Sequence, residues 1–191
     1  RTFLATLKTD GLVILDATNG KTMAFQDWRT SFRTNSTTPN VIGNKIFLST
    51  GYRRGCGLFE FTGADLRQVY SNKNMSNHMN NSVVLDGFVY GFDGNTHMAG
   101  PKQLVCLRLA DGIVQWRKEG YRCGSLMAVQ NHLLVLGETG NLALGPASPK
   151  DFQPIAAGQV LNGKCWTVPV LSNGRIFVRN ATGDLVCVDA R

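Results

Sequence analysis

Glutamate is nearly absent from this 191-residue chain, which contains only Glu60, Glu119 and Glu138. The sequence is correspondingly poor in strong helix formers, and it carries 21 glycines, a balance that favours short strands joined by turns. Charged residues make up only 17% of the chain and hydrophobic residues 43%, which excludes a disordered segment and leaves enough apolar surface for a core.

No apolar run approaches the roughly 20 residues that a membrane-spanning helix needs. The longer apolar stretches, at 12–15 and 133–136, have the length of strands. The chain also lacks an initiator methionine and a signal peptide, and strand-like residues follow Arg1 at once. We therefore expect further residues upstream of Arg1 and derive no targeting signal from this end.

The net charge is +7, yet the basic residues are scattered and Arg53-Arg54 is the densest group. Nucleic-acid-binding modules gather such residues on one face, together with aromatic platforms. The spread along this sequence favours ordinary solvated charge over a nucleic-acid partner.

The sequence repeats itself at a nearly constant period. A turn-then-strand unit at 43–50 recurs at 86–94, 130–140 and 172–183, and a shortened copy opens the chain. Successive landmarks lie 43, 43, 44 and 43 residues apart, which indicates a repeat architecture with each landmark on the equivalent strand of its unit. The landmark residues are Phe3, Ile46, Val89, Leu133 and Ile176.

Each full unit contains four short strands in about 43 residues, the length of a β-propeller blade. One twisted four-stranded sheet cannot bury both of its faces, so such units stack radially. An immunoglobulin-like sandwich is the structural alternative, but it offers no reason for the repeat. We predict an all-β propeller of about 18 strands in about 4.5 blades. The predicted repeat units are 1–32, 33–76, 77–120, 121–163 and 164–191.

The first predicted unit lacks its first strand, and the last ends after its third. We therefore expect the chain to form the C-terminal half of a propeller of about seven or eight blades, with closure into a small ring of its own as the alternative. In the larger ring, the two terminal blades pack against the remaining half, in the same protein or another chain, and residues 184–190 pair with a strand from elsewhere. The apolar residues expected to be covered in this way include Phe3, Leu12, Ile14, Phe177 and Val186.

Several segments resemble the pyrroloquinoline-quinone-like β-propeller repeat proteins, among them VLDGFVYGFDG, LVCLRLADGIVQWRKEG and CWTVPVLSNGRIFVRNATGDLVCVDAR. The chain is most similar to the stand-alone bacterial members of the kind common in planctomycetes, and to the outer-membrane-assembly lipoprotein, a non-catalytic scaffold. The resemblance covers nearly the whole chain. It implies a propeller fold and an extracytoplasmic location, periplasmic or secreted.

The same family includes quinoprotein dehydrogenases, which bind pyrroloquinoline quinone and calcium in the central channel and carry a vicinal Cys-Cys disulfide. This sequence has no adjacent cysteines. We therefore predict a non-enzymatic propeller that needs no cofactor and binds a protein partner or a small ligand through its loops and channel mouth. The alternative is that the chain is part of a pyrroloquinoline-quinone-dependent dehydrogenase, with the quinone and calcium as cofactors.

In a propeller, the first strand of each blade lines the channel, and its entry loop lies at one mouth. The aligned entry loops carry polar, cationic and aromatic side chains, a combination that suits an anionic or carbohydrate-like ligand. The candidate binding residues are Arg33, Asn35, His78, Asn80, Arg122, Lys164 and Trp166. The alternative is that these groups hydrogen-bond neighbouring blades and channel water.

The sequence predicts no metal site and no catalytic residue, because its three histidines are separated and lack nearby carboxylates. Cys106 and Cys187 hold the same strand position and are expected to be buried. Cys123 and Cys165 match at the starts of consecutive first strands, where a disulfide could form.

Overall fold

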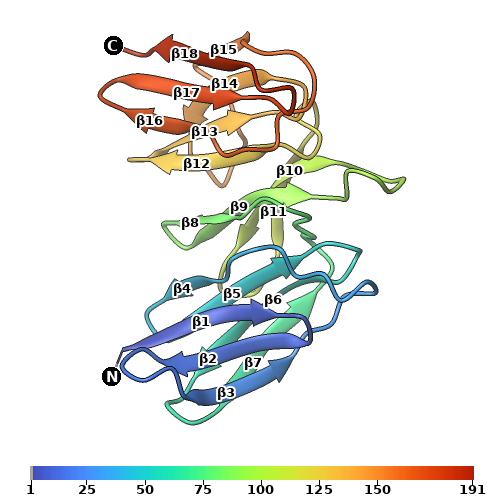
Figure 1. The fold of residues 1–191 in the computed structure, drawn as a ribbon, viewed down its shortest axis with the longest axis vertical. Coiled ribbons are helices and arrows are strands. Elements are labelled where there is room, and N and C mark those ends of the chain that lie inside the picture. The colour runs from blue at the N-terminus through green and yellow to red at the C-terminus, as the bar shows by residue number, and fades with distance from the viewer. Residues whose placement is uncertain (1) are drawn as a thin grey trace.

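The computed structural model describes residues 2–191, and all regular structure in this part of the chain is β-strand. Eighteen strands form five sheets that are stacked along the long axis, with the N-terminal sheet at one end and the C-terminal sheet at the other (Figure 1). The prediction of an all-β chain with 18 strands is confirmed. None of the described residues forms a helix that could cross a membrane.

The sheets follow chain order. Sheet 1 contains β1 (Phe3–Lys8), β2 (Gly11–Asp16) and β3 (Thr22–Asp27). Sheet 2 contains β4 (Asn40–Ile42), β5 (Lys45–Thr50), β6 (Gly55–Phe61) and β7 (Leu66–Asn72). Sheet 3 contains β8 (Val83–Leu85), β9 (Phe88–Asp93), β10 (Gln103–Arg108) and β11 (Val114–Lys118). Sheet 4 contains β12 (Ser125–Val129), β13 (His132–Leu136), β14 (Asn141–Pro146) and β15 (Ala156–Gln159), and sheet 5 contains β16 (Val170–Ser172), β17 (Arg175–Arg179) and β18 (Leu185–Asp189).

Every sheet is an antiparallel meander in which each strand pairs with the next along the chain. The hairpins that open sheets 3 and 5 turn at Asp86–Gly87 and Asn173–Gly174. All four residues have positive φ, between 48° and 80°, as a type I′ turn requires. Asp, Asn and Gly tolerate this conformation, so the local sequence fixes these hairpins.

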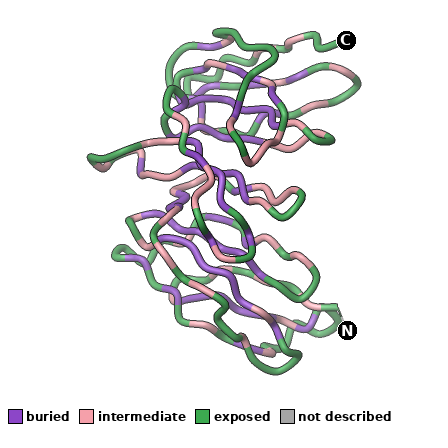
Figure 2. The backbone as a smooth tube through the Cα atoms, turned by 180° about the vertical axis from the view of Figure 1, so that it is seen from behind, coloured by how far each residue is buried: buried purple, intermediate pink, exposed green. Residues whose placement is uncertain are grey.

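Hydrophobic side chains form four separate cores, one between each pair of neighbouring sheets. Leu12 and Ile14 of sheet 1 meet Ile46 of sheet 2, for example, and Leu58 of sheet 2 lies in the next core with Val89 of sheet 3. Sheets 2, 3 and 4 are therefore buried on both faces and the terminal sheets on one. Figure 2 shows the buried segments running through the stacked strands, with exposed segments in the loops and at the two ends.

Four of the five landmark residues occupy the second position of their strands and face the preceding sheet, namely Ile46, Val89, Leu133 and Ile176. Phe3 lies on the equivalent strand but faces the following sheet, with its ring centroid 5.0 Å from that of Phe61. The true counterpart is Leu4, which is 55% exposed. The prediction was wrong by one residue here, and a shift of one residue exchanges the two faces of a strand.

The outer faces of sheets 1 and 5 are open. Their exposed apolar residues include Leu4 and Phe25 on sheet 1 and Val170 and Leu185 on sheet 5. Phe177 points outward with its cross-strand neighbours Val170 and Cys187, as predicted. The prediction was wrong for Phe3, Leu12, Ile14 and Val186, because strand alternation places these side chains against the neighbouring sheet instead.

All five cysteines are free thiols, so buried Cys123 and Cys165 are not joined by a disulfide. Cys106 is fully buried between sheets 3 and 4, as predicted. Cys187 holds the equivalent position in sheet 5 but is exposed, because no described sheet follows it.

Candidate functional site

The connections between sheets lie at one end of the stack, together with the loops that join the second and third strands of sheets 2 to 5 and the equivalent β1–β2 loop of sheet 1. Hydrogen bonds between these loops and connections show that they are close together. The Asn35 side chain donates to the Lys8 carbonyl at 2.7 Å, and Cys165 N–H donates to the Glu138 carbonyl at 2.8 Å. We call this end the loop face, and it comprises 9–10, 28–39, 51–54, 73–82, 94–102, 119–124, 137–140, 160–169 and 180–184. The opposite turn face comprises 17–21, 43–44, 62–65, 86–87, 109–113, 130–131, 147–155, 173–174 and 190–191.

The loop face carries a net positive charge. Its segments contain eight Lys or Arg residues and four Asp or Glu residues, whereas the smaller turn face contains three Lys or Arg residues and four Asp or Glu residues. Fewer than half of the 20 basic residues of the chain lie on the loop face, but there they outnumber the acidic residues. The eight are Arg29, Arg33, Arg53, Arg54, Lys73, Lys102, Arg122 and Lys164.

A continuous row of aromatic rings crosses the loop face. The ring centroids of Phe32 and Tyr52 lie 4.8 Å apart, and those of Tyr52 and His78 5.2 Å apart. His97 follows, 6.0 Å from His78 and 6.0 Å from Trp166. We call these five residues the aromatic row. Each comes from a different loop, so the row links connections that belong to sheets 1 to 5.

Both ring nitrogens of His78 have partners. Nε2 lies 3.3 Å from the Tyr52 hydroxyl, and Nδ1 lies 3.2 Å from the Thr96 hydroxyl. Partial burial, and secondarily the neighbouring His97, lower the pKa of His78 below its usual 6.5. At neutral pH this ring is therefore uncharged and fixes two other loops.

A buried carboxylate organises the end of the aromatic row. Glu138 Oε1 accepts the indole N–H of Trp166 at 3.1 Å, and Oε2 lies 3.3 Å from Arg122 Nε and 3.4 Å from the Cys123 N–H. The Glu138 side chain is only 8% exposed. Lys164 lies over the Trp166 ring at 5.1 Å, a cation–π contact. The structure thus brings the predicted residues Arg122, Lys164 and Trp166 together around an acid that was not predicted.

The remaining predicted residues lie elsewhere on the loop face. Arg33, beside Phe32, faces Asp10 at 3.9 Å. Asn35 and Asn80 use their side-chain N–H groups to bind backbone carbonyls, and Asn80 reaches Gly124 of the next connection at 2.6 Å. These two asparagines tie segments that are far apart in the sequence to one another on the loop face.

Three arginines of this face have left-handed backbone, with φ between 53° and 57° at Arg33, Arg53 and Arg122. Such conformations cost free energy for residues other than glycine and persist only where surrounding contacts hold them. Phe32, Tyr52, His97 and Glu138 were missed by the sequence analysis. A search for aromatic residues in the loops after second strands would have found Tyr52 and His97.

These sheets, each an antiparallel meander packed face to face with the next sheet along the chain, define a β-propeller. No protein-family model matches the chain, and no curated protein matches its sequence. Similar solved structures include BamB from Moraxella catarrhalis, with a TM-score of 0.69, 15% identity and coverage of 97% of this chain and 53% of that one. A quinohemoprotein alcohol dehydrogenase, ADHIIG from Pseudomonas putida HK5, is also similar, with a TM-score of 0.71, 12% identity and coverage of 98% of this chain and 39% of that one.

A third similar structure is the computationally designed Ika8 protein, with a TM-score of 0.71, 9% identity and coverage of 100% of this chain and 56% of that one. The three comparisons support the β-propeller fold. This chain spans about half of BamB and of Ika8, and less of the dehydrogenase.

Residues 2–191 hold no group of three or more His, Cys, Asp or Glu side chains placed to bind a metal ion. The buried carboxylate of Glu138 already binds Arg122 and Trp166.

Proposed function

We propose that this chain is a non-enzymatic, extracytoplasmic propeller module whose loop face binds an acidic segment of a partner protein. The observation behind the proposal is the aromatic row on a face that also carries an excess of arginine and lysine. Aromatic residues and arginine dominate the energetics of protein interfaces, and a cationic surface steers acidic partners toward it.

Two features favour binding over chemistry. The Glu138 carboxylate is engaged by Arg122 and Trp166, and both nitrogens of His78 have hydroxyl partners. Neither group is therefore presented to a substrate as a free acid or base.

The arrangement of the rings favours a protein over a nucleic acid. Nucleic-acid bases stack on open aromatic faces. Here Tyr52, His78, His97 and Trp166 meet edge to face, at interplanar angles of 88° to 90°, so they cover one another. Only Phe32 and His97 of the row are exposed.

Trp166 provides the test, because it is the only half-buried tryptophan and Trp28 and Trp116 are buried. Titration with a short synthetic peptide rich in Glu and Phe is expected to change the tryptophan emission, and the binding should weaken as salt is added. Arg122→Gln and Lys164→Gln should weaken it further, whereas Lys21→Gln on the turn face should not. Equal binding of a Lys-rich peptide, tighter binding of an oligonucleotide, or an equal effect of Lys21→Gln would contradict the proposal.

We also propose that further propeller polypeptide, from the same protein or another chain, covers the outer faces of sheets 1 and 5. A cavity of about 470 Å³ lies beside β18, between the apolar side chains of Leu142, Leu144 and Val188. Sheets 2 to 4 have a fourth strand, and a fourth strand paired with β18 would occupy this space. The outer face of sheet 1 has a second opening, of about 480 Å³, that is lined by Val13 and Phe25 among others.

The quinone-dependent alternative has a direct test. Addition of pyrroloquinoline quinone with calcium, followed by dye reduction with alcohols or sugars, would give turnover only if the protein is a dehydrogenase. Reproducible turnover would overturn the non-enzymatic proposal.

A further inference from the structure

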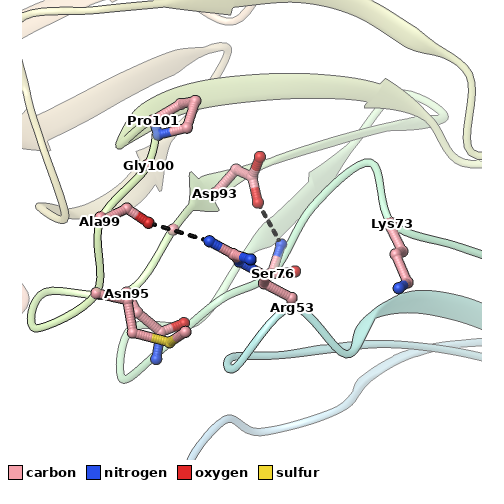
Figure 3. Close-up of a pocket in the computed structure, with 10 residues that line it drawn as sticks. Arg53, Lys73, Ser76, Asp93, Asn95, Ala99, Gly100 and Pro101 are labelled. Carbon is pink, nitrogen blue, oxygen red and sulfur yellow. Dashed lines mark hydrogen bonds between the residues drawn. The ribbon is translucent and has the colours of Figure 1, made fainter.

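A separate cavity opens on the loop face between sheets 2 and 3, outside the aromatic row (Figure 3). It measures about 320 Å³, toward the lower end of the range for small-molecule sites. Its walls are formed by three segments: residues 51–54, the start of the connection after β7, and the loop that follows β9. Met98, Ala99 and Pro101 make one wall largely apolar, and the opposite wall is polar.

The single carboxylate in the wall is already neutralised. Asp93 Oδ2 accepts a hydrogen bond from Arg117 Nη1 at 2.8 Å, and Oδ1 accepts the Ser76 N–H at 2.9 Å. Arg117 is itself held in place by a second bond, from Nη2 to the Asn74 carbonyl at 2.8 Å. Asp93 is therefore not available as a counterion for the other cations of the cavity.

The cavity wall also carries two cationic residues, Arg53 and Lys73, which come from different segments (Figure 3). Arg53 makes one long hydrogen bond, 3.4 Å from Nη2 to the Ala99 carbonyl. Within residues 2–191, neither Arg53 nor Lys73 has a carboxylate oxygen close enough for an ion pair. The cavity thus carries two positive charges with no anion to match them.

The backbone holds Arg53 in this position. Tyr52 and Arg53 are consecutive left-handed residues, with φ of 58° and 57°. Asn95 clamps the turn, because its Oδ1 accepts the Tyr52 N–H at 2.7 Å, while Arg54 is held over the Trp28 ring at 3.6 Å. These contacts direct Arg53 and Arg54 to different neighbours and keep Arg53 at the cavity.

Asn95 supplies a further polar group. Its side chain lines the cavity wall, the residue is 6% exposed, and its Nδ2 has no acceptor among the described residues. A buried donor without an acceptor costs free energy.

We propose that this cavity binds a phosphomonoester of a small polar molecule, of the sugar-phosphate class. A dianionic phosphate matches the two unpaired cations, whereas a carboxylate would leave one of them unmatched. The volume beyond the phosphate and the apolar wall accommodate the body of a small sugar. This proposal can be tested apart from the acidic-protein proposal, since Arg122, Lys164 and Trp166, which test that proposal, do not line the cavity.

Calorimetric titration of the 191-residue chain with glucose 6-phosphate, inorganic phosphate and glucose tests the site. We expect glucose 6-phosphate to bind more tightly than phosphate, and glucose not to bind. Arg53→Gln and Lys73→Gln should each lower the affinity for glucose 6-phosphate about tenfold, since each removes a charge-assisted contact. Lys21→Gln, a matched loss of charge on the turn face, should leave the affinity unchanged. Both cavity variants change exposed side chains, and a thermal melt would verify that they fold.

Three results would overturn the proposal. These are no heat from glucose 6-phosphate at millimolar concentration, equal weakening by Lys21→Gln, and equal binding of glucose. Trp166→Ala separates the two proposed sites when both ligands are titrated by calorimetry, because it should abolish the binding of the acidic peptide and leave the binding of glucose 6-phosphate unchanged. If Trp166→Ala weakened both ligands equally, the cavity would not be a separate site.

Discussion

Glu138 holds Trp166 by its indole N–H, at 3.1 Å, across two loops that are 28 residues apart in the sequence. A carboxylate that is 8% exposed therefore sets the position of the most accessible tryptophan of the fold. Arg122 balances its charge from a third loop. The three side chains act as one unit, so their contributions are not expected to be additive.

Replacement of the acid should release this unit. Glu138→Ala is expected to lower the free energy of unfolding by about 1–3 kcal/mol, because the indole N–H and Arg122 lose a partly buried acceptor. Urea unfolding measures the loss, and a shift of tryptophan emission to longer wavelength reports the release of Trp166. Thr139→Ala on the same loop is the control, since its side chain is exposed. Equal destabilisation by the two variants would show that Glu138 has no special role.

The thiols should differ sharply in reactivity. Burial raises the pKa of Cys56, Cys106 and Cys123 to about 12, and it also raises the pKa of Cys165. Since the thiolate is the reactive form, a thiol reagent at mildly alkaline pH should label exposed Cys187 quickly and the other four slowly. Unfolding should expose all five. Cys187→Ser should remove the fast phase, and a fast phase that survives would refute the assignment.

Stability should fall in mild acid. The pKa of His78 is lowered in the fold, so the unfolded chain binds its proton more readily. The stabilisation is complete above the unfolded pKa of 6.5 and is lost as the pH falls below it toward the folded value. Thermal melts across this window should show a smaller pH dependence for His78→Gln than for the parent. His132→Gln, which replaces a histidine at the turn-face end of β13, is the matched control variant.

The outer faces of sheets 1 and 5 should drive association. Exposed apolar groups such as Phe25 and Leu185 favour contact with other polypeptide, at about 25 cal/mol per Å² of apolar area buried. Light scattering on the isolated chain should therefore detect aggregates or a ring-completing dimer. Phe25→Lys with Leu185→Lys should shift the protein toward monomer. A parent chain that stays a cooperatively folding monomer of 20.9 kDa would contradict this expectation.

The repeat made most of the fold predictable from sequence. Apolar residues at a constant period, such as Ile46, Val89 and Leu133, specify which strands are equivalent, and turn residues mark where they end. The error at Phe3 has a physical cause. Phe3 and Leu4 are adjacent and both apolar, so their side chains point to opposite faces of β1. The alternation of apolar and polar residues therefore cannot indicate which of the two faces the neighbouring sheet.

The candidate site was only partly predictable. Arg122, Lys164 and Trp166 could be found because they lie in loops that the repeat aligns. Tyr52 and His97 could have been named as aromatic residues of the loops after the second strands, but their ring contacts run between loops of irregular length and could not be predicted. A buried carboxylate such as Glu138 gives no sign of its burial in the sequence.

The division of the interior into four cores, each shared by two neighbouring sheets, makes this a nearly one-dimensional molecule. Stability in such a chain is close to a sum of sheet terms and nearest-neighbour interface terms. When residues 1–191 are studied alone, the central sheets are held from both sides and the terminal sheets from one, so opening begins at sheets 1 and 5. A substitution in the core between sheets 4 and 5 would loosen the last sheet long before sheet 2 responds, and amide exchange would fall off in steps, sheet by sheet, toward the middle of the stack.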